Sequence, residues 1–583
     1  MQQRRSAAHL TLSLLVLVAG RSAAAAENPN SQFDSTKSTS NEINTSTAAE
    51  TESKQTSVSA DEVKLLQKQL ALQQDQIEKL RHELDEQKQR IDRALQPSQA
   101  SSAQAPNLGQ IASINPVIPK SVTKSENASG PLAAAPVTVA ATSAEEKTEE
   151  SPLQLHVGSA SITPVGFMDF TSVWRNHTGG SGIGTNFASI PYGNVFQNNL
   201  SEFRLSMQNS RIGFRVDADV KGAHVIGYME SDFLGNNPGN VAVSSNSNTM
   251  RSRLYWLDLR KGRWEVLGGQ TWSLITPGRT GISPLPGDLF YTQVIDVNYQ
   301  LGLFWGRIPE LRVVYHPTDK VAFAVALESP EQYMGGSAGG GKVTFPSALS
   351  STYAAGELND GSTTLNTPNV APDVIAKLAF DPSKKFHFEM GGVERNFKLW
   401  NPTDSTTHTA AGGGGFVNLN FELFKGFRIL TANFFSDGGG RYIFGQAPDL
   451  IARVDGSLSL IHASSTVTGF EYTHKNSLIY SYYGGLYVGR NVTIDTNGKS
   501  VGYGYSGASA GQNRAIQEAT FGFAQTFWKD AKYGALTLMG QYSYLTRSPW
   551  SVATGQPNDA NLNMVFLNLR YTLPGSAPAT KKK

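Results

Sequence analysis

The sequence predicts an all-β fold, a transmembrane barrel of sixteen antiparallel strands, preceded by an α-helical coiled coil. Tight turns that contain lysine alternate with long loops rich in Gly, Ser and Asn. The segments between them have the roughly 9 to 11 alternating residues of a tilted spanning strand. Outside the amino-terminal region no apolar run is long enough for a transmembrane helix, so a spanning chain must close a barrel. The turn lysines are Lys221, Lys261, Lys320, Lys384, Lys385, Lys425, Lys475, Lys529 and Lys532.

One strand, seven hairpins and a closing strand account for the sixteen predicted strands. An even number places both ends of the barrel on the side of the short turns, as in single-chain bacterial barrels. The predicted strands are Val165–Trp174, Arg211–Val220, Ala223–Met229, Arg253–Arg260, Arg263–Thr271, Leu311–Pro317, Val321–Glu328, Asp373–Phe380, Phe386–Phe397, Phe416–Phe424, Phe427–Phe435, Val467–Thr473, Leu478–Val488, Gln517–Trp528, Ala535–Tyr544 and Met564–Leu573.

The closing segment Met564–Leu573 alternates without a fault, and its apolar side should face lipid. A large soluble sandwich or propeller would also have alternating strands. Three features favour the membrane barrel instead. Aromatic residues cluster near the strand ends, as they do in membrane-interface girdles. Short turns and long loops occupy opposite ends of the strands, and the chain starts with an export signal.

The amino-terminal residues read as an exported and then unfolded region. Residues 1–26 begin with two arginines, Arg4 and Arg5, followed by an apolar core and a small-residue stretch, which describes a secretory signal peptide. Residues 27–59 have almost no large apolar side chains, so we expect them to be disordered. Residues 96–152 are rich in Pro and Ala and should form an extended linker. The basic tail 575–583 follows the barrel domain 153–574.

Residues 60–95 carry apolar side chains at alternating spacings of three and four, which predicts a coiled coil. A single amphipathic helix docked on the barrel would show the same stripe, but the polar flanks favour self-association. Two glutamines in the seam could fix register and strand number. The seam is Val63, Leu66, Leu70, Gln73, Ile77, Leu80, Leu84, Gln87 and Ile91.

Composition excludes several functions. The chain has no cysteine, which removes disulfides, thiolate metal sites and a cysteine nucleophile. Its net charge of +2, without a basic cluster interleaved with aromatics, does not indicate nucleic-acid binding. No HExxH motif is present. We therefore expect neither enzyme activity nor a cofactor or metal site.

The chemistry of a channel lies at its constriction. The segment from Trp272 to about Asn298 follows the fifth strand and should fold into the lumen, bringing Arg279, Asp288 and Asp296. Opposite charges on this loop and on the wall would set charge preference. Alternatively, each wall cation could have a purely structural role, in which it pairs with a carboxylate and stiffens the barrel. The predicted lumen-facing cations are Arg204, Arg211, Arg215, Arg251, Arg253, Lys377, Arg395, Arg428 and Arg570.

The order of these segments resembles the DcaP-like trimeric porins of Gram-negative outer membranes. Short motifs add to the resemblance, which covers most of residues 155–574: Ser210–Phe214, Gly268–Ser273, Tyr299–Gly302 and Pro372–Ile375. The resemblance implies an outer-membrane homotrimer with a periplasmic coiled coil, and passive diffusion of small anionic solutes, often dicarboxylates. The chain departs from general porins at Gln270, where many have arginine, and in its tail beyond Tyr571.

Two alternatives remain open from sequence. Phosphate-selective porins also place a coiled segment before sixteen strands. A structural envelope tether or a surface adhesin would use the coiled coil and the long loops 329–371, 437–466 and 489–514. An adhesin would need its coil outside the cell, whereas here the coil precedes the first strand and should lie in the periplasm. A tether could coexist with transport if the coil contacts the cell wall.

Overall fold

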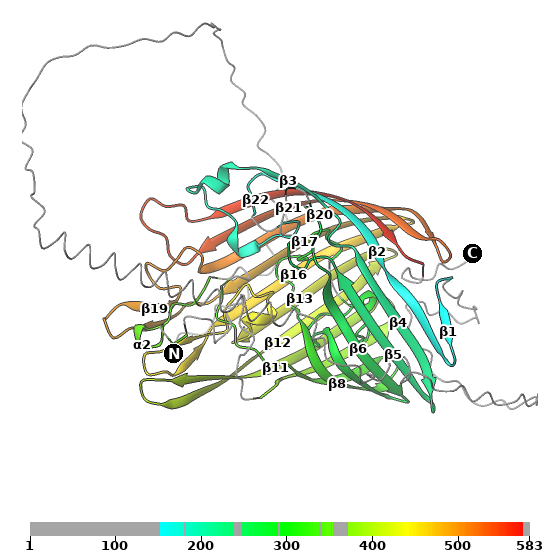
Figure 1. Cartoon of the computed structure of the whole chain (residues 1–583), viewed down its shortest axis with the longest axis horizontal. Helices are drawn as coiled ribbons and strands as arrows, with labels where there is room; N and C mark the ends of the chain where they lie inside the picture. The colour runs from blue at the N-terminus through cyan, green and yellow to red at the C-terminus, as the bar shows by residue number, and fades with distance from the viewer. Residues whose placement is uncertain are drawn as a thin grey trace, which may run out of the picture. The chain divides into compact units, whose positions relative to one another are not determined.

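The computed structural model describes residues 152–574, apart from 180–181, 238–241, 243, 245, 290–291, 337–340, 351 and 354–370. The signal peptide, the Ser/Thr-rich segment, the coiled-coil seam, nearly all of the linker and the basic tail lie outside the described residues. The described part is an antiparallel β-barrel that confirms all sixteen predicted strands (Figure 1).

The spanning strands are generally longer than predicted, mostly at the end where the long loops attach. They are β2 Ala160–Arg175, β4 Arg211–Val220, β5 Ala223–Asp232, β6 Arg251–Lys261, β7 Trp264–Trp272, β8 Arg307–Thr318, β9 Val321–Glu328, β10 Asp373–Ser383, β11 Phe386–Asn401, β12 Thr406–Phe424, β13 Phe427–Asp437, β16 His462–His474, β17 Ser477–Val488, β20 Asn513–Asp530, β21 Gly534–Pro549 and β22 Ala560–Thr572.

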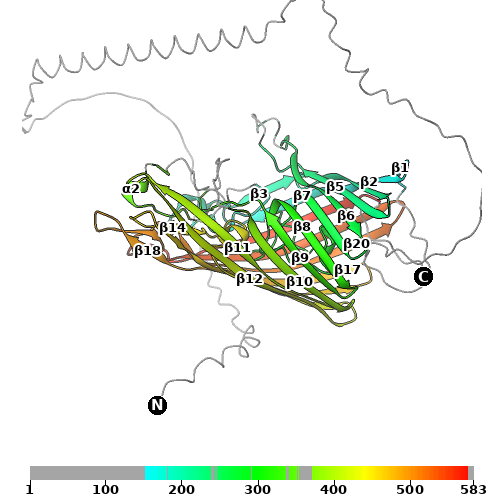
Figure 2. The ribbon, with the colours of Figure 1, turned by 90° about the horizontal axis from the view of Figure 1, so that it is seen from below.

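The barrel closes because its first and last spanning strands pair. β2 and β22 are antiparallel, with Asp169 opposite Arg570 and Trp174 opposite Val565. Every other spanning strand pairs with its neighbours in sequence, so the strands lie side by side around the wall (Figure 2). A closed ladder leaves no sheet edge exposed to hydrocarbon.

The second strand is interrupted, which the sequence did not predict. β3 (Glu202–Ser206) pairs with the end of β2, and β4 pairs with its beginning. Between them the Ser210 hydroxyl accepts a hydrogen bond from the Asp169 amide at 2.9 Å. The short β1 (Leu155–Val157) also pairs with β2 and, with β3, completes the eighteen-stranded sheet.

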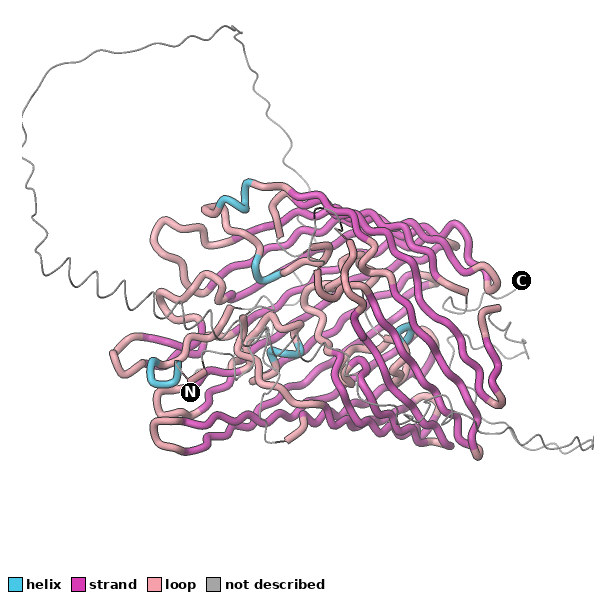
Figure 3. Tube along the Cα trace, viewed as in Figure 1, coloured by secondary structure: helices cyan, strands magenta, loops and turns pink. Residues whose placement is uncertain are grey.

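Short turns lie at one end of the barrel and long loops at the other, as predicted (Figure 3). The turn between β4 and β5 shows the local cause. Lys221 and Gly222 both have positive φ, 52° and 76°. That conformation is the two-residue turn whose twist matches a hairpin.

The two faces of the strands carry different side chains. In β22, Val565, Leu567 and Leu569 are exposed on the outside, whereas Phe566 and Asn568 are buried inside. This confirms the predicted lipid-facing side. No helix among the described residues is long and apolar enough to cross a membrane.

The long loops contain small elements that contact one another at the loop end. α2 (Ser347–Ser350) belongs to the loop after β9, where Thr344 exchanges two backbone hydrogen bonds with Gly502 of β19, at 3.0 and 2.9 Å. A small apolar cluster joins the loop after β9 to β11 and to the β14–β15 pair. The other loop elements are β14 Leu450–Ala452, β15 Leu458–Leu460, β18 Asn491–Ile494, β19 Ser500–Tyr503 and the 3-10 helices η2 Phe187–Ser189, η3 Phe196–Asn199, η4 Pro286–Asp288 and η5 Gly440–Tyr442.

Candidate functional site

The loop of residues 273–306, between β7 and β8, runs inside the barrel as predicted for a constriction loop. Its backbone amides would be unsatisfied in an apolar interior, and wall side chains accept their hydrogen bonds. The first arm of the loop reaches from β10 to β21 through the pairs Gly278–Glu389 (2.8 Å), Gly281–Asp381 (3.0 Å), Gln293–Tyr482 (3.1 Å) and Ile295–Gln541 (2.6 Å).

The second arm of this loop returns along the same walls. The Leu301 amide donates to Glu518 of β20 at 2.9 Å, and the Trp305 amide donates to the Tyr442 carbonyl at 2.8 Å. Phe304 is fully buried against Phe434. The loop thus contacts the wall from β9 to β21, and its Tyr299 hydroxyl accepts hydrogen bonds from Arg211 of β4 at 3.4 Å and Arg253 of β6 at 3.2 Å on the other side of the barrel.

Glu389 of β11 is the most densely bonded of the wall carboxylates that hold the loop. Besides the Gly278 amide, it accepts hydrogen bonds from Lys377 at 3.2 Å and from Asn418 at 3.0 Å. The His387 ring lies 3.3 Å from the same carboxylate. Lys377 also donates to the Thr276 carbonyl at 2.7 Å. This predicted pore cation is buried and fastens the loop to the wall.

The three charged residues predicted on the loop have different surroundings. Arg279 forms a bidentate ion pair with Glu471 of β16, at 2.8 and 3.0 Å. Asp296 is buried and accepts hydrogen bonds from Thr185 and from the Asn298 amide at 2.8 Å, so it joins two loops. Burial raises the pKa of the Asp296 carboxyl, although the Thr185 hydrogen bond opposes this.

Asp288 is the loop carboxylate on which the charges of β4 and β6 act. Burial raises the pKa of Asp288 above its ordinary value, while a hydrogen bond from Ser283 and the guanidiniums of Arg260 and Arg215 act to lower it. Arg215 lies on β4 and Arg260 on β6. The charges of two wall guanidiniums therefore act on this loop carboxylate.

Each predicted wall cation forms an ion pair with a carboxylate, mostly on its own or a neighbouring strand. Arg211, Arg251 and Arg253 share the carboxylates of β5, and Arg211 and Arg570 both lie against the ring of Phe167, at 5.1 and 4.3 Å from its centre. Arg204 lies apart, on β3. The pairs are Arg204–Glu202 (3.3 Å), Arg211–Glu230 (3.5 Å), Arg215–Asp217 (2.7 Å), Arg251–Asp232 (2.8 Å), Arg253–Glu230 and Arg253–Asp232 (both 2.7 Å), Lys377–Glu389 (3.2 Å), Arg395–Asp373 (3.0 Å), Arg395–Asp449 (2.9 Å), Arg428–Glu422 (3.5 Å) and Arg570–Asp169 (2.7 Å).

Several of these pairs are asymmetric in exposure. The Arg570 side chain is 26% exposed and its partner Asp169 is fully buried. Arg251 is 40% exposed over a fully buried Asp232. Arg215 and Asp217 are an exception, with similar exposures. In the asymmetric pairs the guanidinium, and not the carboxylate, stays in contact with solvent.

Sequence reasoning missed several charged residues of the interior. Arg260 pairs with Asp258 at 2.7 Å. Simple alternation from inward-facing Arg253 would place Arg260 on the outer face of β6, and the register shift between β5 and β6 is the irregularity that brings both residues inside. Arg312 pairs with Glu310 on the same face of β8, which alternation within that strand could have found, whereas the pairing of Arg441 with Asp373 at 3.1 Å depends on a tertiary contact. Arg307 begins β8 ahead of the predicted strand.

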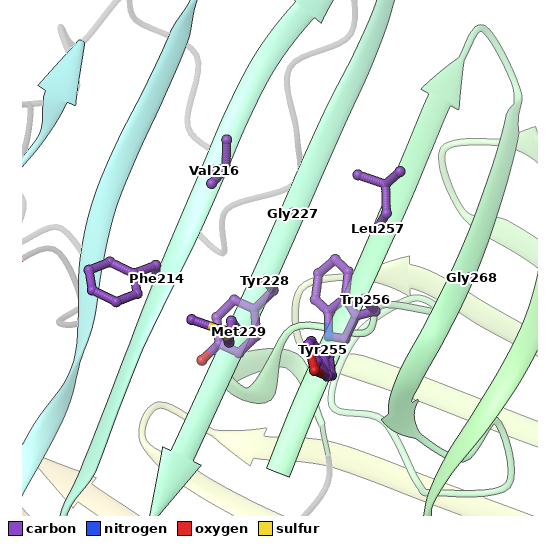
Figure 4. Close-up of a pocket in the computed structure, with 9 residues that line it drawn as sticks. All are labelled: Phe214, Val216, Gly227, Tyr228, Met229, Tyr255, Trp256, Leu257 and Gly268. Carbon is purple, nitrogen blue, oxygen red and sulfur yellow. The ribbon is translucent and has the colours of Figure 1, made fainter. Parts of the chain in front are cut away.

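The outer wall has an apolar depression over β4–β7, where two glycines, Gly227 and Gly268, face outward (Figure 4). A Cβ built on Gly268 would contact nothing within 4 Å, and Gly227 has only Val216 as a neighbour. Exposed Met229 and Leu257 lie beside these glycines. The depression is a place where another apolar surface could approach the backbone closely.

No model of a known protein family matches the chain, and no curated protein sequence matches it. Solved structures do. The outer-membrane channel DcaP of Acinetobacter baumannii is 17% identical with a TM-score of 0.52, covering 71% of this chain and 97% of that one. The anion-selective porin from Comamonas acidovorans is 12% identical with a TM-score of 0.40, covering 71% and 99%. The likeness to DcaP shows a shared fold and supports the resemblance inferred from the sequence.

We predict that Gly484→Ala destabilises the barrel by displacing the second arm of loop 273–306. A Cβ at Gly484 would collide with the Leu301 carbonyl oxygen. Overpacking of this kind costs about 1–3 kcal/mol. Urea unfolding of the refolded barrel, followed by tryptophan fluorescence, would measure the loss.

The neighbouring Gly485→Ala is the matched control, because a Cβ there first meets an atom at 3.7 Å. It should unfold at nearly the same urea concentration as the wild type. Equal stability of Gly484→Ala and Gly485→Ala would contradict the placement of the loop against β17.

Proposed function

We propose that the chain is an outer-membrane porin, a passive diffusion channel for small hydrophilic solutes with a preference for anions such as dicarboxylates. The asymmetric ion pairs of the interior carry this proposal. In a polar lumen the nearer charge of a pair dominates the field on a passing solute. Guanidiniums that stay exposed above buried carboxylates therefore favour anions.

The route of loop 273–306 supports a narrowed passage, because the loop is held to the wall of β9–β21 and its Tyr299 also reaches Arg211 and Arg253 on the wall of β22, β2 and β4–β6. Arg215 and Arg570 line that wall, and Asp288 faces it from the loop. Opposed charges of this kind orient dipolar solutes and set charge preference. Pairing of every predicted wall cation argues against the continuous track of free arginines expected of a tightly phosphate-selective channel.

The coil and the oligomeric state extend the same proposal. Both ends of the barrel chain lie at the turn end, so a barrel with its turns in the periplasm places residues 60–95 there. We propose a homotrimer that associates through the outer wall at Gly227 and Gly268, with the coil as a second contact. Contact of the coil with the cell wall would add a tether role without replacing transport.

The chain inserted into a planar lipid bilayer should give ohmic current steps. In a KCl gradient the reversal potential should shift toward that of chloride, because exposed guanidiniums attract anions. Succinate or phosphate is then added on one side of the bilayer. Block of the current by succinate would favour the dicarboxylate interpretation, and block by phosphate would favour the phosphate interpretation. Cation selectivity would contradict the anion preference, and a folded barrel without conductance would favour the tether.

Asp288→Asn should increase the anion preference, because it removes a negative charge that faces Arg215 and Arg260. Asp559→Asn, an exposed carboxylate in the loop before β22, is the matched control. Since burial raises the pKa of Asp288, the difference between wild type and Asp288→Asn should begin to fade at a higher pH than an ordinary aspartate would require. Equal reversal potentials for all three proteins would place Asp288 away from the solute path.

Chemical cross-linking in native membranes should yield trimers of the full chain. Deleting residues 60–95 should lower the trimer yield, while deleting the neighbouring residues 27–59, a segment of similar length, should not. Products that stop at dimers would refute the homotrimer.

A further inference from the structure

Arg307, the first residue of β8, differs from the cations that sequence reasoning selected. It is half-buried at the loop end of the barrel, and its side chain forms no ion pair or hydrogen bond within the described residues. Its guanidinium carbon lies 5.6 Å from the ring centre of Trp272 and 5.5 Å from that of Trp305. Both indoles are buried, so they keep water from two sides of the charge.

The neighbours of Arg307 add positive charge. Arg253 and Arg251 repel its guanidinium, and Asp232 attracts it without forming an ion pair. Arg253 takes part directly in the same cluster, with its guanidinium carbon 6.0 Å from the Trp272 ring. The Arg253 side chain also donates to the Tyr299 hydroxyl at 3.2 Å. The cluster is thus built from β5, β6, β7, β8 and loop 273–306.

The carboxylates of this cluster are already engaged. Asp232 forms ion pairs with both Arg251 and Arg253, at 2.8 and 2.7 Å. Glu230 lies 2.7 Å from Arg253 and 3.5 Å from Arg211. Counted with Arg307, four guanidiniums share two carboxylates, which leaves a local excess of two positive charges. A cation desolvated by indoles and lacking a counter-ion is costly unless an anion joins it.

We propose that Arg307, between the Trp272 and Trp305 indoles, is a binding subsite for a small carboxylate solute. This inference rests on the proposed channel function and places a stopping point for the solute at its loop end. The planar guanidinium offers paired N–H donors that match both oxygens of a carboxylate. The indoles lower the local dielectric constant, which strengthens the bond.

Arg251 supplies the second charge that draws a solute to this subsite. Its side chain stays 40% exposed above Asp232, whereas Arg253 is almost fully buried and held by two carboxylates. A solute whose carboxylate is bound to Arg307 therefore has one further accessible cation in the cluster, Arg251. A solute with a second carboxylate should bind more tightly than one with a single carboxylate.

Calorimetric titration of the full-length, detergent-folded protein with succinate, acetate and inorganic phosphate tests the subsite. We expect succinate to bind more tightly than acetate or phosphate. Arg307→Gln should weaken succinate binding about tenfold or more, the loss typical of a hydrogen-bonded charge. Arg514→Gln, at an exposed arginine near the start of β20, is the matched control and should bind like the wild type.

The same proteins in planar bilayers with KCl separate this inference from the channel itself. Conducting Arg307→Gln channels that have lost succinate binding would support the subsite. Conducting Arg307→Gln channels that bind succinate like the wild type would overturn it and leave the porin intact. Phosphate bound more tightly than succinate would overturn the carboxylate assignment. If the wild-type protein does not conduct, the porin proposal is overturned. If it also fails to bind succinate, the subsite is overturned as well.

Discussion

The closed backbone ladder is the constraint on which the rest of this structure depends. In hydrocarbon every strand amide and carbonyl must find a partner in the protein, and pairing of β2 with β22 removes the last two edges. Where the ladder breaks, between β3 and β4, the Ser210 side chain takes over one backbone bond at Asp169. Closure also fixes which side chains face inward, so the position of every charge follows from strand register.

Loop 273–306 faces the same requirement inside the barrel and meets it with wall carboxylates. Glu389, Asp381 and Glu518 each accept a hydrogen bond from a loop amide. Glu389 and Glu518 are buried and contribute little to the field on a solute, whereas Asp381 stays partly exposed. The hydrogen bonds that the loop backbone requires therefore affect the electrostatics of the passage, because buried carboxylates that hold the loop no longer present negative charge at the lumen surface.

Alternation alone predicted the sixteen strands and the inward side of Arg211 and Arg570, because the period of two survives even in marginally hydrophobic segments. It failed where local composition conflicts with tertiary pairing. β12 starts ten residues before the predicted Phe416, since the glycines before it read as loop but pair on both sides. Pro309 hid the start of β8, and with it Arg307. The partners of the wall cations and the path of loop 273–306 depend on register between distant strands, which no local pattern contains.

Ion pairing does not cancel the anion preference argued from the interior, because the two charges of a pair lie at different depths. An anion about 4 Å from a guanidinium and about 7 Å from the carboxylate behind it gains roughly 2 kcal/mol at an effective dielectric constant of about 20. A cation at the same place loses as much. Such a bias is large enough to sort solutes by charge and small enough to release them quickly, which a diffusion channel needs. Arg570 above Asp169 has this geometry, whereas Arg215 beside an equally exposed Asp217 does not. Selectivity then depends on how deeply each carboxylate is buried as much as on how many arginines are present.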